Sequence, residues 1–427
     1  MRKTIRGSQA KWSTKDLLRR LSHALHVAER VVERLAANGY TDSRDPSNNI
    51  RPEKLISETA FLLVGASTVG KQLGVARHIH RVAERLLPYA RSQRMLLGMC
   101  MEVSLALDYA QAHICLTRLG YPDPAFDAVL RKSLSSQARD GRERTPYRML
   151  EQEWLIRTWN GGRSKYGRKH LWAERESVLA RPMDLLGGSR EDVYAFTHAL
   201  IYTTDFNLKP RRLPRPASEI LAEAEAALAR CLDEEDYDLG GEVLLTWPLT
   251  KGSWNAPATF GFRVLARVED QAGFLPSPST KLQRVNEMTG DERTDYLLAT
   301  GYHTEYVMGL LCAAGLHSGT LSSGAISDMS HGVGSHALIL RVLDADPRRR
   351  HWRDDFDRLA QPERDAIARL LFAMALRRIA IQRNFAALRE LLATGYRLGL
   401  ANCPVASQAA ELLDRVSAAA PTLLASR

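Results

Sequence analysis

The sequence predicts an all-α protein, because apolar residues recur at three- and four-residue spacing along most of the chain. Segments with this period are bounded by Gly, Pro, Asp or Ser, which are typical of helix ends. Almost no stretch alternates polar and apolar residues as a half-buried strand does, and no pair of such stretches flanks an Asn-Gly or Asp-Gly turn. We therefore expect an α/α toroid-like fold or an α-solenoid array of antiparallel helix pairs.

Isolated polar side chains within the most apolar helices favour the toroid over the solenoid. Several of these segments carry a single His, Asp, Glu or Tyr, as helices that line a central cavity do. Helix pairs recur through both halves, but no strict period of the tetratricopeptide or armadillo kind is found. We therefore favour the toroid and keep the open solenoid as the alternative.

The same periodicity places the individual helices. In the first half we expect helices over 15–37, from Pro52 onward, over 73–87, over 92–119 and from Pro124. In the second half we expect helices over 191–206, 217–232, 237–247, 257–270, 294–316, 363–382 and 407–420. Residues 140–166 are rich in Gly, Arg and aromatic residues, which predicts an irregular connection.

The predicted connection divides the chain into three regions. Residues 1–140 form an N-terminal helical region, 141–180 a basic irregular connection, and 181–427 a C-terminal helical region that carries the candidate site. One continuous toroid is the alternative.

Positive charge is concentrated in one part of the chain. The formal net charge is +10, and the segment Arg131–Arg175 holds twelve Lys or Arg against five Asp or Glu. Such a surface could bind an acidic peptide, a carrier protein or nucleic acid. We favour a solvated loop and helix face, because no recognised nucleic-acid-binding module accompanies it.

Cysteine usage and hydropathy predict a soluble, cytoplasmic protein. The five cysteines are widely scattered without a CxxC pair, which is typical of reduced thiols. No stretch resembles a signal peptide or reaches the roughly 20 apolar residues that span a bilayer. We therefore expect no association with a membrane.

The segment THALIYTTDF (197–206) carries the first candidate site. On a helix, His198, Tyr202 and Asp205 stand at i, i+4 and i+7 and therefore share one face. An imidazole, a phenol and a carboxylate on an apolar helix are suited to general acid–base work or metal binding. The alternative is a buried polar network that fixes helix packing.

The segment GYHTEYVMGLLC (301–312) carries the second. Gly301 could begin the helix, which would place His303 and Glu305 in its first turn, while Tyr302 and Tyr306 share one face. Between the two segments, Trp247 lies beside a Gly-containing turn. It could frame the mouth of a ligand site, although helix-end capping is favoured.

Other motifs are set aside. GASTVGKQ (65–72) fits GxxxxGK, but Gln72 replaces the Ser or Thr that ligates Mg²⁺, and its context is helical. His331 and His336 lack the spacing of a standard zinc pair. The HExxH and GxSxG signatures are absent.

Two short elements carry a resemblance to a known family. Thr197-His198, followed by Thr204-Asp205-Phe206, and Tyr302-His303-Thr304 resemble elements of an uncharacterised family of bacterial all-helical proteins. The likeness covers roughly residues 50–320, and it implies an association with natural-product, often peptide-modifying, gene clusters. A weaker architectural similarity is to the α/α toroids of lanthionine and terpene cyclases, but neither the Cys-Cys-His zinc set nor the DxDD acid is matched.

These observations predict an enzyme or enzyme-like accessory protein of bacterial specialised metabolism, with a small-molecule or peptide substrate. The expected catalytic residues are His198, Asp205, His303 and Glu305, acting by acid–base or metal chemistry, and the expected substrate-binding residues are Tyr202, Trp247, Tyr302 and Tyr306. The alternative is a non-catalytic scaffold that binds an acidic partner through Arg131–Arg175. The sequence identifies no cofactor and no oligomeric state.

Overall fold

The computed structural model describes residues 12–36, 50–69, 74–161, 167–207, 212–319, 336–346 and 350–425. Every regular element within these residues is helical, so the prediction of an all-α protein is confirmed. The first half forms α1 (Thr14–Leu35), α2 (Pro52–Ala66), α3 (Val75–Ala90), α4 (Gln93–Met101), α5 (Ala106–Arg118), α6 (Pro124–Leu134), α7 (Pro146–Trp159) and α8 (Gly167–Glu176).

The second half continues with helices of very different length. They are α9 (Arg190–Thr204), α10 (Ala217–Glu234), α11 (Tyr237–Leu244), α12 (Thr246–Thr250), α13 (Ala256–Ala272), α14 (Leu282–Glu287), α15 (Gly290–Ser318), α16 (His336–Asp344), α17 (His351–Asp357), α18 (Gln361–Ala366), α19 (Ala368–Ile381), α20 (Phe385–Arg397) and α21 (Pro404–Ala425). None of these helices is both long enough and apolar enough to cross a lipid bilayer.

Local sequence chemistry sets many helix ends. The Ser13 side chain accepts the Asp16 N–H at the start of α1, and Pro52 occupies the first turn of α2, where its missing N–H costs nothing. Ser189 and Asp192 form a reciprocal capping box at the start of α9. Gly273 ends α13 with φ +75°, a backbone conformation that few other residues adopt without strain.

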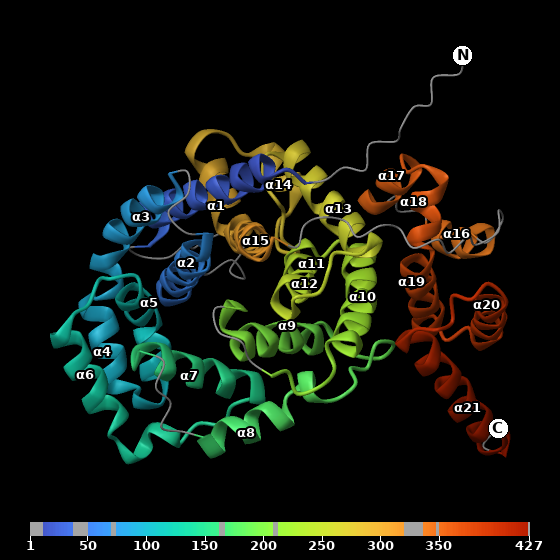
Figure 1. Ribbon diagram of the computed structural model, residues 1–427, viewed down its shortest axis with the longest axis horizontal. Helices are drawn as coiled ribbons and strands as arrows, with labels where there is room; N and C mark the ends of the chain where they lie inside the picture. Colours follow the sequence, from blue (N-terminus) through green and yellow to red (C-terminus); the bar gives the residue numbers. More distant parts are fainter. Residues whose placement is uncertain are drawn as a thin grey trace.

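Helix contacts form a closed path around the molecule. α15 contacts α2, α2 contacts α5, α5 contacts α7, α7 contacts α9, α9 contacts α11, and α11 returns to α15. Figure 1 shows four helices of this path, α2, α9, α11 and α15, toward the centre of the molecule, with α3, α8, α10 and α13 farther out. α16–α21 lie beyond it and pack on it through α10 and α13. The choice between toroid and solenoid stays a prediction.

Several predicted boundaries were wrong. The helix expected over 363–382 is divided at Ile367 into α18 and α19, and the helix expected over 73–87 continues through Pro88 to Ala90. The expected irregular connection over 140–166 contains a helix, α7, because Pro146 opens it and Leu150 and Trp154 are buried in the core. The single helix expected over 92–119 is divided at Glu102 into α4 and α5. The two parts fold closely on each other: a Cβ on Gly98 would lie 2.4 Å from Tyr109 Cε1. The division of the chain into three regions stays a prediction.

Two glycines that were expected to begin a helix and a GxxxxGK motif, Gly301 and Gly65, instead lie inside helices at close packing contacts. Gly301 does not begin a helix, since it lies within α15, where a Cβ would be 3.3 Å from Phe274 Cδ2. Gly65 lies within α2, where a Cβ would be 2.2 Å from Leu310 Cδ2. The start of the GxxxxGK match therefore serves the contact between α2 and α15. Residues 70–72 of that match, and His331, lie outside the described residues.

Candidate functional site

Two histidines from distant segments approach the same carboxylate. His198 on α9 has its Nδ1 atom 3.5 Å from Glu242 Oε2, and His303 on α15 has its Nε2 atom 3.7 Å from Glu242 Oε1. Glu242 lies on α11 and is buried. Thr197 Oγ1 also donates a hydrogen bond of 2.6 Å to Glu242 Oε2. His198 and His303, both expected from the sequence as catalytic residues, therefore lie beside one carboxylate, and their chemical role stays a prediction.

Two further carboxylates surround the His303 ring. Glu58 Oε2 on α2 is 3.2 Å from Nδ1, and Asp238 Oδ1 on α11 is 3.5 Å from Nε2. Tyr302 Oη donates a hydrogen bond of 2.7 Å to the same Glu58 oxygen. We call His198, His303, Glu58, Asp238 and Glu242 the His303 cluster; it joins α2, α9, α11 and α15, the inner helices of Figure 1.

Opposite charges set the protonation of this cluster. Burial by itself lowers the pKa of His303, but the charges of Asp238 and Glu58, together with the nearby Glu242, raise it well above its usual value. Burial raises the pKa of Glu58, but the charges of His303 and Lys54, together with the Tyr302 hydrogen bond, outweigh this and lower it to about 2. His303 is therefore held as a cation that its acidic neighbours share.

The same balance acts on the two carboxylates of α11. Burial would raise the pKa of Glu242, but the charges of His198 and His303, which lie 3.5 and 3.7 Å away, place it well below its usual range. Burial and the neighbouring Glu242 raise the pKa of Asp238 despite the attraction of His303. Asp238 is therefore the carboxyl of the cluster most ready to take up a proton.

Solvent reaches the cluster, although it lies among core helices. The His303 and Glu58 side chains keep 26% and 22% of their surface exposed. The Tyr194 ring stacks on His198 with ring centroids 3.8 Å apart, and the Tyr147 ring meets it edge-on. Polar groups in reach of solvent beside aromatic walls are typical of sites for small ligands.

His198 turns one ring nitrogen inward and leaves the other available. Its Nδ1 atom is 3.0 Å from the backbone oxygen of Tyr194, one turn earlier on α9. Within the described part of the chain, no hydrogen bond or ion pair is formed by Nε2. The fixed Nδ1 contacts orient the ring, so that Nε2 can meet a substrate.

Asp205 and Tyr202 lie near each other but belong to a different network from His198. Asp205 ends α9 with φ +50°, and its Oδ1 atom accepts hydrogen bonds from Trp154 Nε1 (2.7 Å) and Arg118 (3.1 Å). Tyr202 Oη donates to Glu151 Oε1 at 2.7 Å. The left-handed turn at Asp205 ends the helix, and the Asp205 carboxylate binds Trp154 and not His198. The carboxylate beside His198 is instead that of Glu242.

Glu305, Trp247 and Tyr306 also lie apart from the His303 cluster. Glu305 is two residues after His303 on the same helix, and such residues project to opposite sides. It contacts the backbone N–H of Leu275. Trp247 is buried beside Trp254, and Tyr306 forms a buried hydrogen bond of 2.9 Å with Thr59. Both aromatic residues lie in the packed core and frame no opening.

Sequence reasoning missed the three carboxylates of the cluster. Glu242 is the only charged residue between Asp238 and Lys251, a stretch of apolar and small residues, and this isolation is the signal that could have identified it. Glu58 opens the apolar run TAFLLVG and has the same signature. Asp238 carries no such mark, because it follows the acidic run DEED at 233–236.

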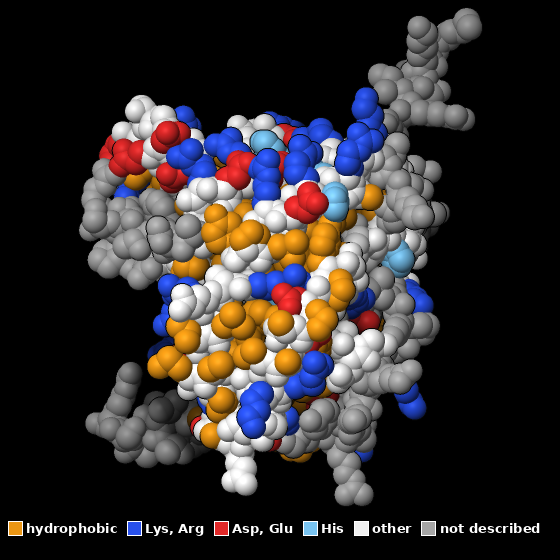
Figure 2. Space-filling view, turned by 90° about the vertical axis from the view of Figure 1, so that its left-hand side faces the viewer, with side chains coloured by type: hydrophobic (Ala, Val, Ile, Leu, Met, Phe, Trp, Pro, Cys, Tyr) orange, Lys and Arg blue, Asp and Glu red, His pale blue; other side chains and the backbone are white. Residues whose placement is uncertain are grey.

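Several arginines of the basic segment bind within the protein. Arg148 pairs with Glu151 at 2.7 Å, Arg157 donates to the Tyr202 backbone oxygen, and Arg144 contacts the backbone oxygen of Ser104. Figure 2 shows the face at the left-hand edge of Figure 1, where Lys and Arg side chains are scattered among hydrophobic ones over the lower half. On this face the drawn residues form no continuous basic patch.

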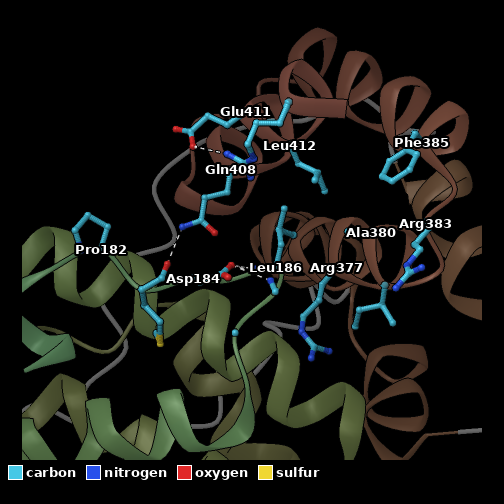
Figure 3. A pocket seen from close by; sticks show the side chains of 15 residues that line it. Pro182, Asp184, Leu186, Arg377, Ala380, Arg383, Phe385, Gln408, Glu411 and Leu412 are labelled. Atoms are coloured by element: carbon cyan, nitrogen blue, oxygen red, sulfur yellow. Dashed lines mark hydrogen bonds and ion pairs between the residues drawn. The ribbon is translucent and has the colours of Figure 1, made fainter. Parts of the chain in front are cut away.

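A pocket of about 670 Å³ lies away from the cluster. Figure 3 shows it between the segment 182–188 and the C-terminal helices. Gln408 Nε2 donates a hydrogen bond of 2.7 Å to the Met183 backbone oxygen and ties α21 to that segment. Charged side chains of both signs line it, among them Asp184, Arg377, Arg383 and Glu411. None of the residues selected from the sequence contributes to this pocket.

Comparison with known proteins gives one result. Residues 21–313 match the model of a family described as a domain of unknown function, DUF6895. No curated protein and no solved structure matches the chain. The match begins within α1 and ends within α15, so it contains every residue of the His303 cluster. The expectation of an uncharacterised family is confirmed. Because the match spans more than half of its residues, the chain belongs to the DUF6895 family.

Proposed function

We propose that this protein is an enzyme that performs acid–base chemistry at the His303 cluster. The observation that carries the proposal is the shared Glu242 carboxylate, which orients imidazoles from two segments about a hundred residues apart. Clusters of solvent-accessible residues with perturbed pKa values occur at functional sites more often than elsewhere in proteins. The perturbed groups here are His303, Glu58, Asp238 and Glu242.

Each group has a distinct part in this chemistry. His198 exchanges a proton with the substrate through Nε2, while Glu242 and the Tyr194 backbone oxygen hold its Nδ1 side. The His303 cation offsets the negative charge of Glu242 and Glu58, and so keeps both ionised inside the protein. Asp238 accepts or returns a second proton. A well-placed general acid or base contributes about 10²–10⁴-fold to a rate.

The charges of the cluster are balanced from several sides. Glu58, Asp238 and Glu242 face His303, while Lys54 lies 3.8 Å from Glu58 and Arg190 lies 3.3 Å from Asp238. The family resemblance of the TH…TDF and YHT elements supports bacterial specialised metabolism as the setting, with a small molecule or peptide as substrate. The closed path of helix contacts supports an α/α toroid around the site.

Genetic complementation with metabolite profiling tests the proposal. A strain of the encoding organism that lacks this protein is complemented with the parent chain, His198→Gln, Glu242→Gln or His80→Ala. Both glutamine variants keep the side-chain size roughly constant, and His80 is an exposed control residue on α3. We expect mass spectrometry to show a compound that the parent and His80→Ala restore and that both glutamine variants fail to restore.

Urea unfolding of the purified variants separates chemistry from folding. We expect each glutamine variant to remain folded at the growth temperature with a cooperative transition. If the folded variants restore the compound as well as the parent does, the cluster is not catalytic. If instead they unfold before the assay, its role is structural.

A further inference from the structure

A second polar group lies on the other side of α15 and contains two buried carboxylates. Glu305 on α15 and Glu269 on α13 are 1% and 3% exposed. In each of them one oxygen is held by a donor: Glu305 Oε1 accepts the Leu275 backbone N–H, and Glu269 Oε2 accepts from Arg20. The other oxygens, Glu305 Oε2 and Glu269 Oε1, are buried without a hydrogen-bond partner. A buried carboxylate oxygen in this state is costly unless a further group satisfies it.

The imidazole of His23 lies close to these two oxygens. His23 on α1 has its Nε2 atom 3.8 Å from Glu305 Oε2. One ligand atom each from His23, Glu269 and Glu305 lie within 4.8 Å of one another. The His23 side chain is 35% exposed, so this residue connects the buried carboxylates to solvent.

We propose that His23, Glu269 and Glu305 bind one divalent transition-metal ion, with Zn²⁺ as the best-suited metal. One imidazole nitrogen and two carboxylate oxygens are ligands that Zn²⁺ takes readily, at about 2.0–2.2 Å. Three protein ligands with one side open to solvent leave a position for water. The site lies outside the His303 cluster, because Glu305 and His303 project from opposite sides of α15.

The donors behind the carboxylates are arranged as an outer shell around a metal requires. The Leu275 N–H and the Arg20 guanidinium each fix one oxygen and leave the other to ligate, so that both glutamates would bind through a single oxygen. Arg20 also pairs with Asp270 at 2.8 Å, which partly balances its positive charge beside the ion. Burial lowers the pKa of His23, which favours the neutral ring that ligates metals.

Two other occupants must be distinguished from a metal ion in the triad. The first is a proton shared by Glu269 and Glu305, which would satisfy both free oxygens without any ion. The second is a metal ion bound on the surface of α1 by His23 and His26, which stand at i and i+3 on that helix. Each of these alternatives predicts a different pattern among variants.

Equilibrium metal binding to the full-length chain tests the proposal. Protein stripped with a chelator is titrated with Zn²⁺ against a chromogenic competitor, and with Co²⁺ to record visible d–d bands. The chain is compared with Glu305→Gln, His23→Ala and His26→Ala. We expect one tightly bound ion per parent chain, retained in His26→Ala and weakened by at least about tenfold in the other two variants, together with loss of the Co²⁺ bands.

Two results would overturn the proposal. If the parent binds no stoichiometric ion, the carboxylates share a proton instead. If binding is lost in His26→Ala and kept in Glu305→Gln, the ion lies on the surface pair of α1. Thermal unfolding with and without Zn²⁺ gives an independent readout, because an ion that binds only the folded chain raises its melting temperature. We expect this rise for the parent and His26→Ala and its absence for Glu305→Gln.

Discussion

Two carboxylates on opposite sides of α15, Glu58 and Glu305, are in opposite electrostatic states. Burial would raise the pKa of Glu58, but the charges of His303 and Lys54 contribute to lowering it to about 2. On the other side, burial and then the charge of Glu269 raise the pKa of Glu305 to about 8, although the Leu275 N–H and Arg20 act against this. The difference teaches that burial alone does not decide the state of a carboxylate, since the summed charge of its neighbours can reverse the effect of burial, as it does for Glu58.

Removing the cation on the first side should have the largest effect. His303→Ala leaves Glu58, Asp238 and Glu242 without their shared positive charge, so we expect a loss of roughly 3 kcal/mol in the free energy of unfolding at pH 7. Urea unfolding measures it. The exposed control His80→Ala should change stability by less than about 0.5 kcal/mol. An equally small change in His303→Ala would show that the ring does not hold these carboxylates together.

Replacing Glu305, on the second side of α15, by a neutral residue should increase the free energy of unfolding at high pH. In the folded chain Glu305 keeps a proton that the unfolded chain releases above about pH 4.5, so stability falls as the pH rises from there to about 8. Glu305→Gln removes this dependence, and in metal-free buffer we expect it to exceed the parent by about 2 kcal/mol at pH 8, since Glu269 shares part of the proton. Urea unfolding between pH 5 and pH 9 measures the two curves. Parallel curves would contradict the raised pKa.

The smallest effect should come from the segment that supports Glu305. Gly301→Ala places a methyl group 3.3 Å from Phe274 Cδ2, beside the Leu275 N–H that contacts Glu305. The higher helix propensity of Ala offsets much of the free-energy cost of this crowding, so we expect the free energy of unfolding to change by less than about 1 kcal/mol. Displacement of Leu275 weakens its hydrogen bond, so the pH dependence due to Glu305 should extend to higher pH. A shift to lower pH would show that Leu275 does not stabilise the ionised form.

The sequence predicts the fold class well because helix periodicity is a local property. The helix from Pro52 and the helix over 191–206 were found within a few residues, since caps and apolar spacing agree there. The division at Glu102 was missed because it depends on Gly98 packing against Tyr109. Residues 92–119 carry no Pro or Asp-Gly that would mark the break.

The candidate site was predicted only in part, for a related reason. His198 and His303 were identifiable because an imidazole in an apolar helix is unusual. Glu242 stands out in the sequence as an isolated charge, but its contact with both imidazoles depends on α11 packing against α9 and α15. Asp205 shares a helical face with His198 by spacing, but the helix ends there in a left-handed turn, and spacing does not predict where a side chain at a helix end points.

The contact of α1 with α15 has a consequence for how the chain folds during synthesis. Arg34 on α1 pairs with Asp295 on α15, 261 positions later, and Arg20 on α1 pairs with Glu269 on the neighbouring α13, 249 positions later. α1 packs on the neighbouring helices α2 and α3, but the part of its surface that contacts α15 stays uncovered until most of the chain has been synthesised. Bringing such distant segments together is slow. A chaperone that shields this first helix should accordingly increase the yield of native protein.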